Sequence, residues 1–139
     1  MSRALLVLQR IREQKKRGAR LSHASAVRKQ EERREAIEEL NSSIAATYEA
    51  EPEMASDLAY ASVYRARMRL RASREERHLR KHTQNVDAAR TRLMKATIEA
   101  EVIGRVIESE RTLVEKRRKR IEERSADGLS TARWAGYSA

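Results

Sequence analysis

The stretch that decides the fold is LRKHTQNVDAARTRLMKATIEAEVIGRVIESERTLVEKRRKRI, residues 79–121, because every seventh residue in it is apolar. These a positions are Leu79, Val86, Leu93, Ala100, Ile107, Val114 and Ile121. The d positions, three residues later, are His82, Ala89, Ala96, Ile103, Glu110 and Arg117. A strict seven-residue repeat of this length is typical of a helix that winds around a partner helix in a left-handed coiled coil. The a and d positions, here called the seam, are therefore predicted to face another helix.

The same frame extends towards the N-terminus through Met54, Leu58, Ala61, Arg65, Met68, Ala72 and Glu75. Of the seam positions between Met54 and Ile121, only five are not apolar: Arg65, Glu75, His82, Glu110 and Arg117. A long rod of this kind transmits force, spaces other proteins or docks against them, because it has no cleft for chemistry.

Composition supports this fold class. Charged residues make up 37% of the 139 residues and aromatic residues only 4%, with four glycines and one proline. A compact core usually depends on large aromatic rings, whereas long helices are rich in charged residues. The chain has no cysteine, which excludes disulfides and thiol chemistry. It has no apolar run long enough for a signal peptide or a membrane span, which points to the cytosol.

A first helix is expected over residues 3–48. Its opening part has a weaker eleven-residue rhythm, and a heptad becomes clear near its end at Ile37, Leu40, Ile44 and Thr47. The positions expected to face the partner in the opening part are Ala4, Leu8, Ile11, Lys15, Ala19, Ser22 and Ala26. Gly18 lies within this helix and is expected to weaken it, because glycine costs about 1 kcal/mol relative to alanine.

The single proline, Pro52, predicts a bend. Proline inside a helix costs about 3 kcal/mol, but it is accepted at a helix start, where Glu51, Glu53 or the possible N-cap Ser56-Asp57 would also fit. We therefore expect an all-α fold in which two long helices form an antiparallel coiled-coil hairpin. A straight parallel dimer is the alternative, because the heptad phase continues unbroken across Pro52.

Charge distribution favours the hairpin. A glutamate-rich stretch of the first helix and an arginine-rich stretch of the second would lie side by side if the chain folded back near residues 50–55. The expected organisation is one elongated domain over 1–139. It has a first helix at about 3–48, a bend at about 49–57, a second helix at about 58–125 that ends near Asp127-Gly128, and a flexible tail at 126–139.

Residues with catalytic or ligand-binding chemistry are sparse. His78 and His82 lie four residues apart, but they have no fixed third ligand and no HExxH motif, so a metal site is not predicted. His23 is alone and is expected to be solvated. The glycines are isolated, and no phosphate-binding loop is present. The sequence predicts no catalytic residue, no cofactor and no enzymatic activity.

The net charge of +10 is compatible with a solvated face held by local ion pairs, and also with nucleic acid, an anionic membrane surface or an acidic protein partner. Twenty-four of the 31 basic residues are arginines, which favour bidentate and stacking contacts. A protein partner is preferred to nucleic acid, because no recognition fold or aromatic platform accompanies the charge. At the bend, the rod tip with Tyr60, Tyr64, Arg67 and Met68 is a candidate docking surface, although these side chains would equally seal the end of the seam.

Together, these features resemble the FliJ/YscO family of central stalk proteins in type III secretion systems. The resemblance is carried by the arginine-punctuated opening segment LLVLQRIR (residues 5–12), a tip with Tyr and Ser-Asp, and a longer heptad-bearing second helix. The basic run at 116–120, followed by the aromatic Trp134 and Tyr137 of the tail, favours the injectisome branch over the flagellar one.

The resemblance implies that the paired ends enter the pore of a hexameric secretion ATPase. The residues expected to face this ATPase are Arg3, Arg10, Arg12, Arg17, Arg111, Arg117, Arg118 and Arg120. Tyr60, Tyr64, Arg67 and Met68 would face the cytoplasmic domain of the export gate, and Trp134 and Tyr137 would dock the tail. Export chaperones are further expected partners, and the implied location is cytoplasmic, at the periphery of the inner-membrane export apparatus.

Two alternatives remain open. One is a homodimeric coiled-coil scaffold or an export chaperone. The other is a basic helical protein that binds nucleic acid or an anionic membrane, with an affinity that falls steeply as salt rises.

Overall fold

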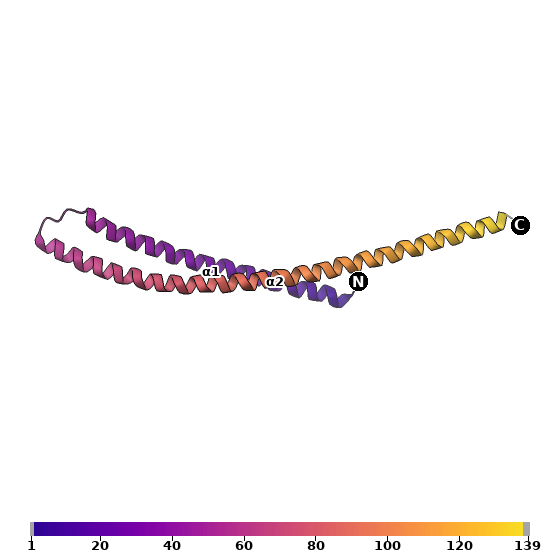
Figure 1. The fold of residues 1–139 in the computed structure, drawn as a ribbon, viewed down its shortest axis with the longest axis horizontal. Coiled ribbons are helices and arrows are strands. Elements are labelled where there is room, and N and C mark those ends of the chain that lie inside the picture. The colour runs from indigo at the N-terminus through magenta and orange to yellow at the C-terminus, as the bar shows by residue number, and fades with distance from the viewer. Residues whose placement is uncertain (1, 138–139) are drawn as a thin grey trace. The chain divides into compact units, whose positions relative to one another are not determined.

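The computed structural model describes residues 2–137, and the regular structure in that range is two α-helices. Helix α1 spans Arg3–Glu49 and helix α2 spans Ala55–Tyr137 (Figure 1). The two helices pack against each other, which confirms the predicted all-α hairpin. Their contacts fall into two units. One contains α1 up to Lys15 with α2 from Thr97, and the other runs from Lys16 to Ala96.

The turn between the helices occupies residues 50–54, inside the predicted bend. Pro52 lies in this turn and therefore removes no helical hydrogen bond. The backbone N–H of Met54 donates to Asp57 Oδ2 (3.0 Å), and the N–H of Asp57 donates to the Met54 carbonyl (3.1 Å). Asp57 is the third residue of α2, so it acts as the returning acid of a capping box rather than as the N-cap.

The seam predicted for α2 is confirmed over most of its length. Among the described residues, the five buried apolar ones are Ala72, Ala89, Ala96, Ala100 and Ile107, and all occupy predicted a or d positions. Every other seam position from Ala61 to Glu110 is half-buried, including the polar ones. Met54 and Leu58 before this range, and Val114 and Ile121 after it, are exposed. The sequence repeat is therefore longer than the part of α2 that α1 covers.

The seam predicted for the opening part of α1 is only partly correct, because Leu8, Ala19 and Ala26 are half-buried but the other predicted positions are not. Ala4, Ile11, Lys15 and Ser22 are exposed, and the half-buried or buried positions instead continue the clear heptad of Ile37 back towards the N-terminus. These positions are Leu5, Gln9, Arg12, Lys16, Ala19, His23, Ala26, Gln30 and Arg33. The strict repeat of α2 imposes a matching heptad on α1, even where this places polar residues in the seam. His23, expected to be solvated, is accordingly half-buried.

The C-terminal segment also differs from the prediction. Helix α2 continues through Asp127 and Gly128 to Tyr137, where a non-periodic tail was expected. A glycine inside a helix costs only about 1 kcal/mol, and no proline follows to stop the helix. The hydroxyl of Thr131 donates to the carbonyl of Asp127 (2.8 Å), which spans the predicted end. The side chain of Tyr137 lies outside the described residues.

Candidate interaction surfaces of the helical hairpin

Arg65 ties the two helices together next to the turn. Its Nε donates to the Thr47 hydroxyl (2.8 Å), its Nη2 donates to the Thr47 carbonyl (2.9 Å), and its guanidinium lies 3.7 Å from the centre of the Tyr48 ring. Arg69, one turn later, donates to the Tyr48 hydroxyl. The last turn of α1 has no basic residue of its own, so Arg65 supplies the positive charge that a helix C-terminus favours.

The predicted tip residues lie in the same unit but differ in accessibility. Tyr60 and Arg67 are exposed, and Tyr64 is about two-fifths exposed. Tyr64 and Met68 line a shallow groove with Ala36 and Leu40 of α1. Tyr60 and Arg67 are therefore the tip side chains most available to a partner, whereas Tyr64 and Met68 partly cover the helix interface.

Two polar contacts cross the middle of the hairpin. Buried Gln30 donates from Nε2 to the Thr83 hydroxyl (3.0 Å), which itself donates to the Leu79 carbonyl (2.9 Å). Arg33 Nη1 lies 3.0 Å from Glu75 Oε2. This ion pair reverses the expected arrangement, because its base comes from the glutamate-rich stretch of α1 and its acid from the arginine-rich stretch of α2.

In the other unit, Glu99 joins α2 to the beginning of α1. Its Oε2 accepts a hydrogen bond from Arg12 Nη1 (2.6 Å) and lies 3.5 Å from Lys15 Nζ. Arg12 is half-buried and belongs to the helix–helix contact. Of the arginines predicted to face the ATPase, Arg12 is thus the one already paired with an acid of this chain across the helices.

The remaining predicted arginines are exposed. Arg3 and Arg10 lie in the same unit as Arg111, Arg117, Arg118 and Arg120, whereas Arg17 lies in the other unit. Arg118 Nε is 3.6 Å from Glu122 Oε1, a solvent-exposed pair of the kind that contributes little. Most of the remaining arginines predicted to face the ATPase therefore lie in one unit, and they make no strong contacts within the described part of the chain.

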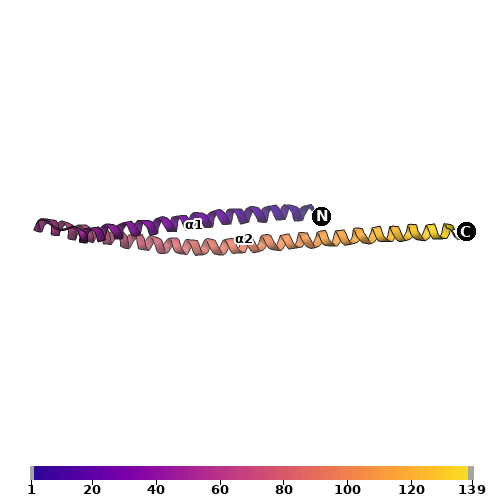
Figure 2. The same ribbon diagram turned by 90° about the horizontal axis from the view of Figure 1, so that it is seen from above.

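Helix α2 extends beyond the start of α1, and residues 111–137 of α2 are here called the overhang (Figure 2). The Arg12–Glu99 contact sets a register that places Arg3, the first residue of α1, opposite about residue 108. Consistent with this register, residues 111–136 are all exposed. The overhang carries seam positions Val114, Arg117 and Ile121 that α1 does not cover.

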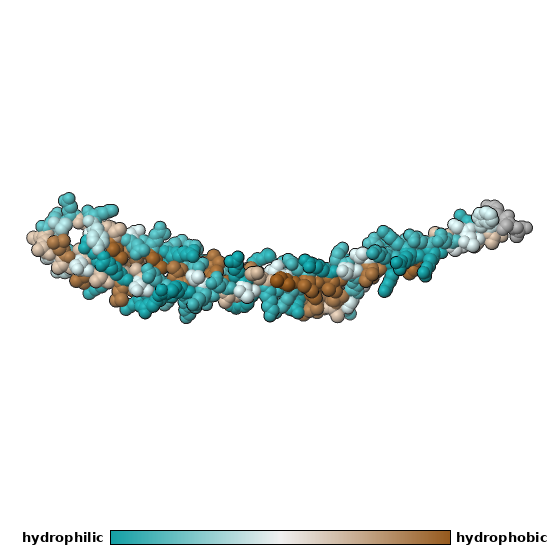
Figure 3. Space-filling model, viewed as in Figure 1, coloured by the Kyte–Doolittle hydropathy of each residue, from teal (hydrophilic) through white to brown (hydrophobic). Residues whose placement is uncertain are grey.

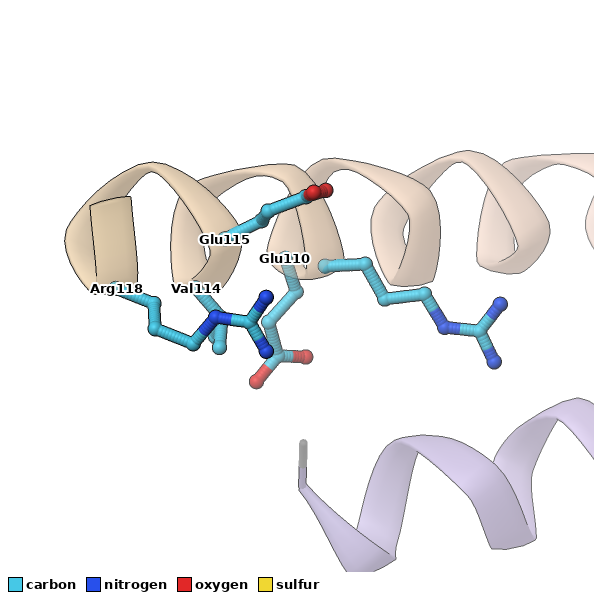
Figure 4. A pocket seen from close by; sticks show the side chains of 5 residues that line it. Glu110, Val114, Glu115 and Arg118 are labelled. Atoms are coloured by element: carbon cyan, nitrogen blue, oxygen red, sulfur yellow. The ribbon is translucent and has the colours of Figure 1, made fainter. Parts of the chain in front are cut away.

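Glu110 is the last seam residue of α2 that α1 partly covers. It is a half-buried seam residue, and its Oε2 is buried with no hydrogen-bond partner among the described residues. In Figure 4, Glu110 and Arg118 project from α2 towards the side on which α1 begins. Together with Arg111, Val114 and Glu115 they line a small open pocket.

The described range holds neither a metal-binding cluster nor a membrane-spanning segment. No group of three or more His, Cys, Asp or Glu side chains there is arranged to hold a metal ion. His82 instead lines a groove with Ala26 and Ala89 between the helices. Neither helix contains, in its described residues, a segment apolar enough to cross a membrane.

Sequence reasoning missed the role of Arg65, which it treated only as a break in the apolar seam. The available signal was its position near the turn, where an arginine can reach the last carbonyls of the preceding helix. At Gly104 of α2, a Cβ would meet nothing within 4 Å, so no close approach requires a glycine there. It is therefore a tolerated glycine within α2.

Comparison with known proteins agrees with this architecture. No curated protein and no solved structure matches the chain. The family model described as "Flagellar FliJ protein" matches residues 1–137, nearly the entire sequence. The chain, a basic helical hairpin with a longer second helix, therefore belongs to the FliJ family.

Proposed function

We propose that this protein is the central stalk of a type III secretion ATPase complex. In this proposal it acts in the cytoplasm, at the periphery of the inner-membrane export apparatus, and works through contacts rather than through catalysis. Membership of the FliJ family supports an export role. The observation that carries the stalk role is the overhang, an exposed basic helix that continues past the end of α1.

The paired helix ends would enter the pore of the hexameric ATPase. Arg3 and Arg10 of α1 and Arg111, Arg117, Arg118 and Arg120 of α2 are exposed and available to acidic groups of the ring. Arg17 is exposed but lies in the other unit, and Arg12 would hold the stalk together through Glu99. A single asymmetric shaft contacts six subunits differently, and only such differential contact can shift their conformational equilibria.

The tip would contact the cytoplasmic domain of the export gate. Tyr60 and Arg67 are exposed beside the turn, and tyrosine and arginine are favoured anchors of protein interfaces. Tyr64 and Met68 would add apolar area along the groove beside α1. Export chaperones are further proposed partners. The link between ATPase and gate would thus run along the hairpin and couple ATP hydrolysis to export.

The injectisome branch is part of the proposal and rests on the basic run and the aromatic residues near the C-terminus. In this chain, residues 116–120 are all basic, and Trp134 follows in the same helix. Trp134 and Tyr137 would dock the end of the overhang. Reconstitution with an injectisome ATPase and, separately, with a flagellar ATPase tests the branch. Stronger stimulation of the flagellar enzyme would contradict the injectisome assignment.

ATP turnover by the purified hexameric ATPase tests the stalk role. Wild-type protein is expected to raise turnover or ring assembly. A triple variant of the overhang, R117E/R118E/R120E, is expected to lose this effect. The matched control R74E/R77E/R80E makes the same change in charge at three exposed arginines of the other unit and should retain it. Equal activity of wild type and R117E/R118E/R120E would overturn the proposal.

A further inference from the structure

Helix α2 carries a second apolar face that α1 does not cover. Its members, here called the outer stripe, are Ile98, Val102, Val106 and Leu113. They are 57%, 49%, 44% and 56% exposed, respectively. At 100° per residue they lie roughly 120° around the helix axis from the seam positions Ala100, Ile103 and Ile107. A surface helix normally has one apolar face, so the second face calls for a second partner.

The outer stripe borders a groove. Leu5 of α1 and Val102, Val106 and Leu113 of α2 supply its apolar lining, with Arg105, Ser109 and Glu110 completing it. Figure 3 shows apolar side chains gathered where the beginning of α1 lies beside α2. All these residues belong to one unit of the structure. The stripe runs along α2 for four helical turns, about 22 Å.

Charge at the two ends of the outer stripe indicates what covers it. Lys95 precedes the stripe, and Lys116 and Arg120 continue the same face beyond Leu113. The nearby Glu99 is already engaged by Arg12 and Lys15. Glu101 lies along one edge, but it is offset by Arg105 on the same edge. The face is therefore apolar in the middle and positive at both ends.

A second copy of this chain fits that pattern poorly. In an antiparallel pair centred on the stripe, Lys116 would lie opposite Lys95 and Arg120 opposite Thr91. In a parallel pair, each basic residue would lie beside its own counterpart. Both arrangements bring like charges together, which is destabilising.

We propose that the outer stripe binds an amphipathic helix of a partner protein, with an apolar central face and acidic residues at both ends. The partner would pack its apolar residues on Val102, Val106 and Leu5, and its acidic ends would meet Lys95 and Lys116. This is helix-in-groove recognition, read through anchors at helical spacing. The stripe lies on a different face from the seam, and the proposal does not depend on the ATPase.

The test uses synthetic helical peptides and the intact chain. The probe is a peptide of about twenty residues, long enough to form a helix, with leucines at the stripe spacing and glutamates at both ends. One comparison peptide replaces the glutamates with lysines, and another scrambles the order of the glutamate peptide. Because the chain has no cysteine, S109C places one environment-sensitive dye in the groove, and S42C places the same dye at an exposed site in the other unit.

The glutamate peptide is expected to shift the emission of the dye at position 109 and not at position 42. Its affinity should fall at least tenfold in V102Q/V106Q and remain unchanged in L21Q, which alters an exposed leucine of the other unit. The lysine and scrambled peptides should bind at least tenfold more weakly. Glutamine is a good helix former, and circular dichroism checks that V102Q/V106Q keeps its helicity.

Three results would overturn the proposal. Equal binding of the lysine peptide would show that the basic residues at the ends of the stripe do not select an acidic partner. Equal binding of the scrambled peptide would show that the peptide binds by nonspecific electrostatic attraction. A wild-type mass in light scattering of two chains, reduced to one chain by V102Q/V106Q, would show that the occupant is a second copy. None of these measurements involves the ATPase, so a failure of the helix-binding proposal is distinguishable from a failure of the stalk proposal.

Discussion

Arg65 of α2 donates two hydrogen bonds to Thr47, one to its hydroxyl at 2.8 Å and one to its carbonyl at 2.9 Å. The same guanidinium lies over the ring of Tyr48. One side chain thus satisfies a carbonyl at the end of α1, complements the helix dipole there and fixes the start of the hairpin. Arg65 occupies a seam position, where an apolar residue would provide none of these contacts.

Replacing Arg65 with methionine is expected to lower the free energy of unfolding by about 1–2 kcal/mol, because the Thr47 carbonyl loses a charged donor. Urea denaturation followed by circular dichroism measures the change. R67M is the matched control, since Arg67 is exposed beside the same turn. It should change stability by less than about 0.5 kcal/mol. Equal effects of R65M and R67M would show that the contacts of Arg65 do not stabilise the fold.

The Gln30–Thr83 hydrogen bond leads to a second prediction. The variant T83V leaves the buried amide of Gln30 without its acceptor and is expected to cost about 1–2 kcal/mol. The double variant Q30M/T83V removes both partners and should lie much closer to wild type, because no unsatisfied polar group remains. A double-mutant cycle by chemical denaturation gives the coupling free energy between Gln30 and Thr83. Additive effects of Q30M and T83V would contradict the pairing.

The glycines at positions 18 and 104 lead to a third prediction. Both lie inside helices, and a Cβ at either position would meet nothing within 4 Å. G18A and G104A should each raise the free energy of unfolding by about 0.5–1 kcal/mol, through helix propensity and a less disordered unfolded chain. Thermal unfolding measures the gain. A loss of stability in G104A would mean that another surface approaches this backbone in solution.

Much of α2 is predictable from the sequence because its repeat is strict. Ala72, Ala89, Ala96, Ala100 and Ile107 form a narrow seam, and small apolar residues at heptad spacing leave few other ways to pair two helices. The bend follows from Pro52 for a similarly local reason. Both features depend on residue types whose backbone or packing requirements are severe.

The opening part of α1 could not be predicted in the same way. Its predicted seam positions Ala4, Ile11 and Lys15 are exposed, because the register imposed by α2 half-buries Gln9, Arg12 and Lys16 instead. Arg12 tolerates this position because Glu99 of the other helix pairs with it. Such pairing depends on a residue 87 positions away, so the pattern of α1 alone does not reveal it.

The candidate interaction surfaces also differ in how far the sequence predicts them. The exposure of arginines such as Arg118 and Arg120, which lie outside the seam, follows from their density in the sequence. The outer stripe was not predicted, because the heptad accounts for the seam and leaves Ile98, Val102 and Val106 on other faces of α2. These residues are i, i+4 and i+8 and could have been found by testing α2 for a second apolar face.

A truncation separates the fold from the proposed function. A chain that ends at Arg111 loses all but the first residue of the overhang, and it keeps the seam from Ala61 to Glu110 and the contacts of Arg65 and Glu99. Residues 112–136 are exposed, so little buried apolar area is lost and the thermal midpoint is expected to change by only a few degrees. The mean residue ellipticity should fall only slightly, because helix is removed together with the residues that form it.

The same truncated chain should no longer stimulate the secretion ATPase, since the arginines at 117, 118 and 120 are gone. A fall of the midpoint by tens of degrees would instead show that the overhang packs on α1 and is part of the fold. Undiminished stimulation would contradict the stalk proposal, as equal activity of R117E/R118E/R120E and wild type would. Retained stability with lost stimulation is expected, because the hairpin is held together before the overhang begins.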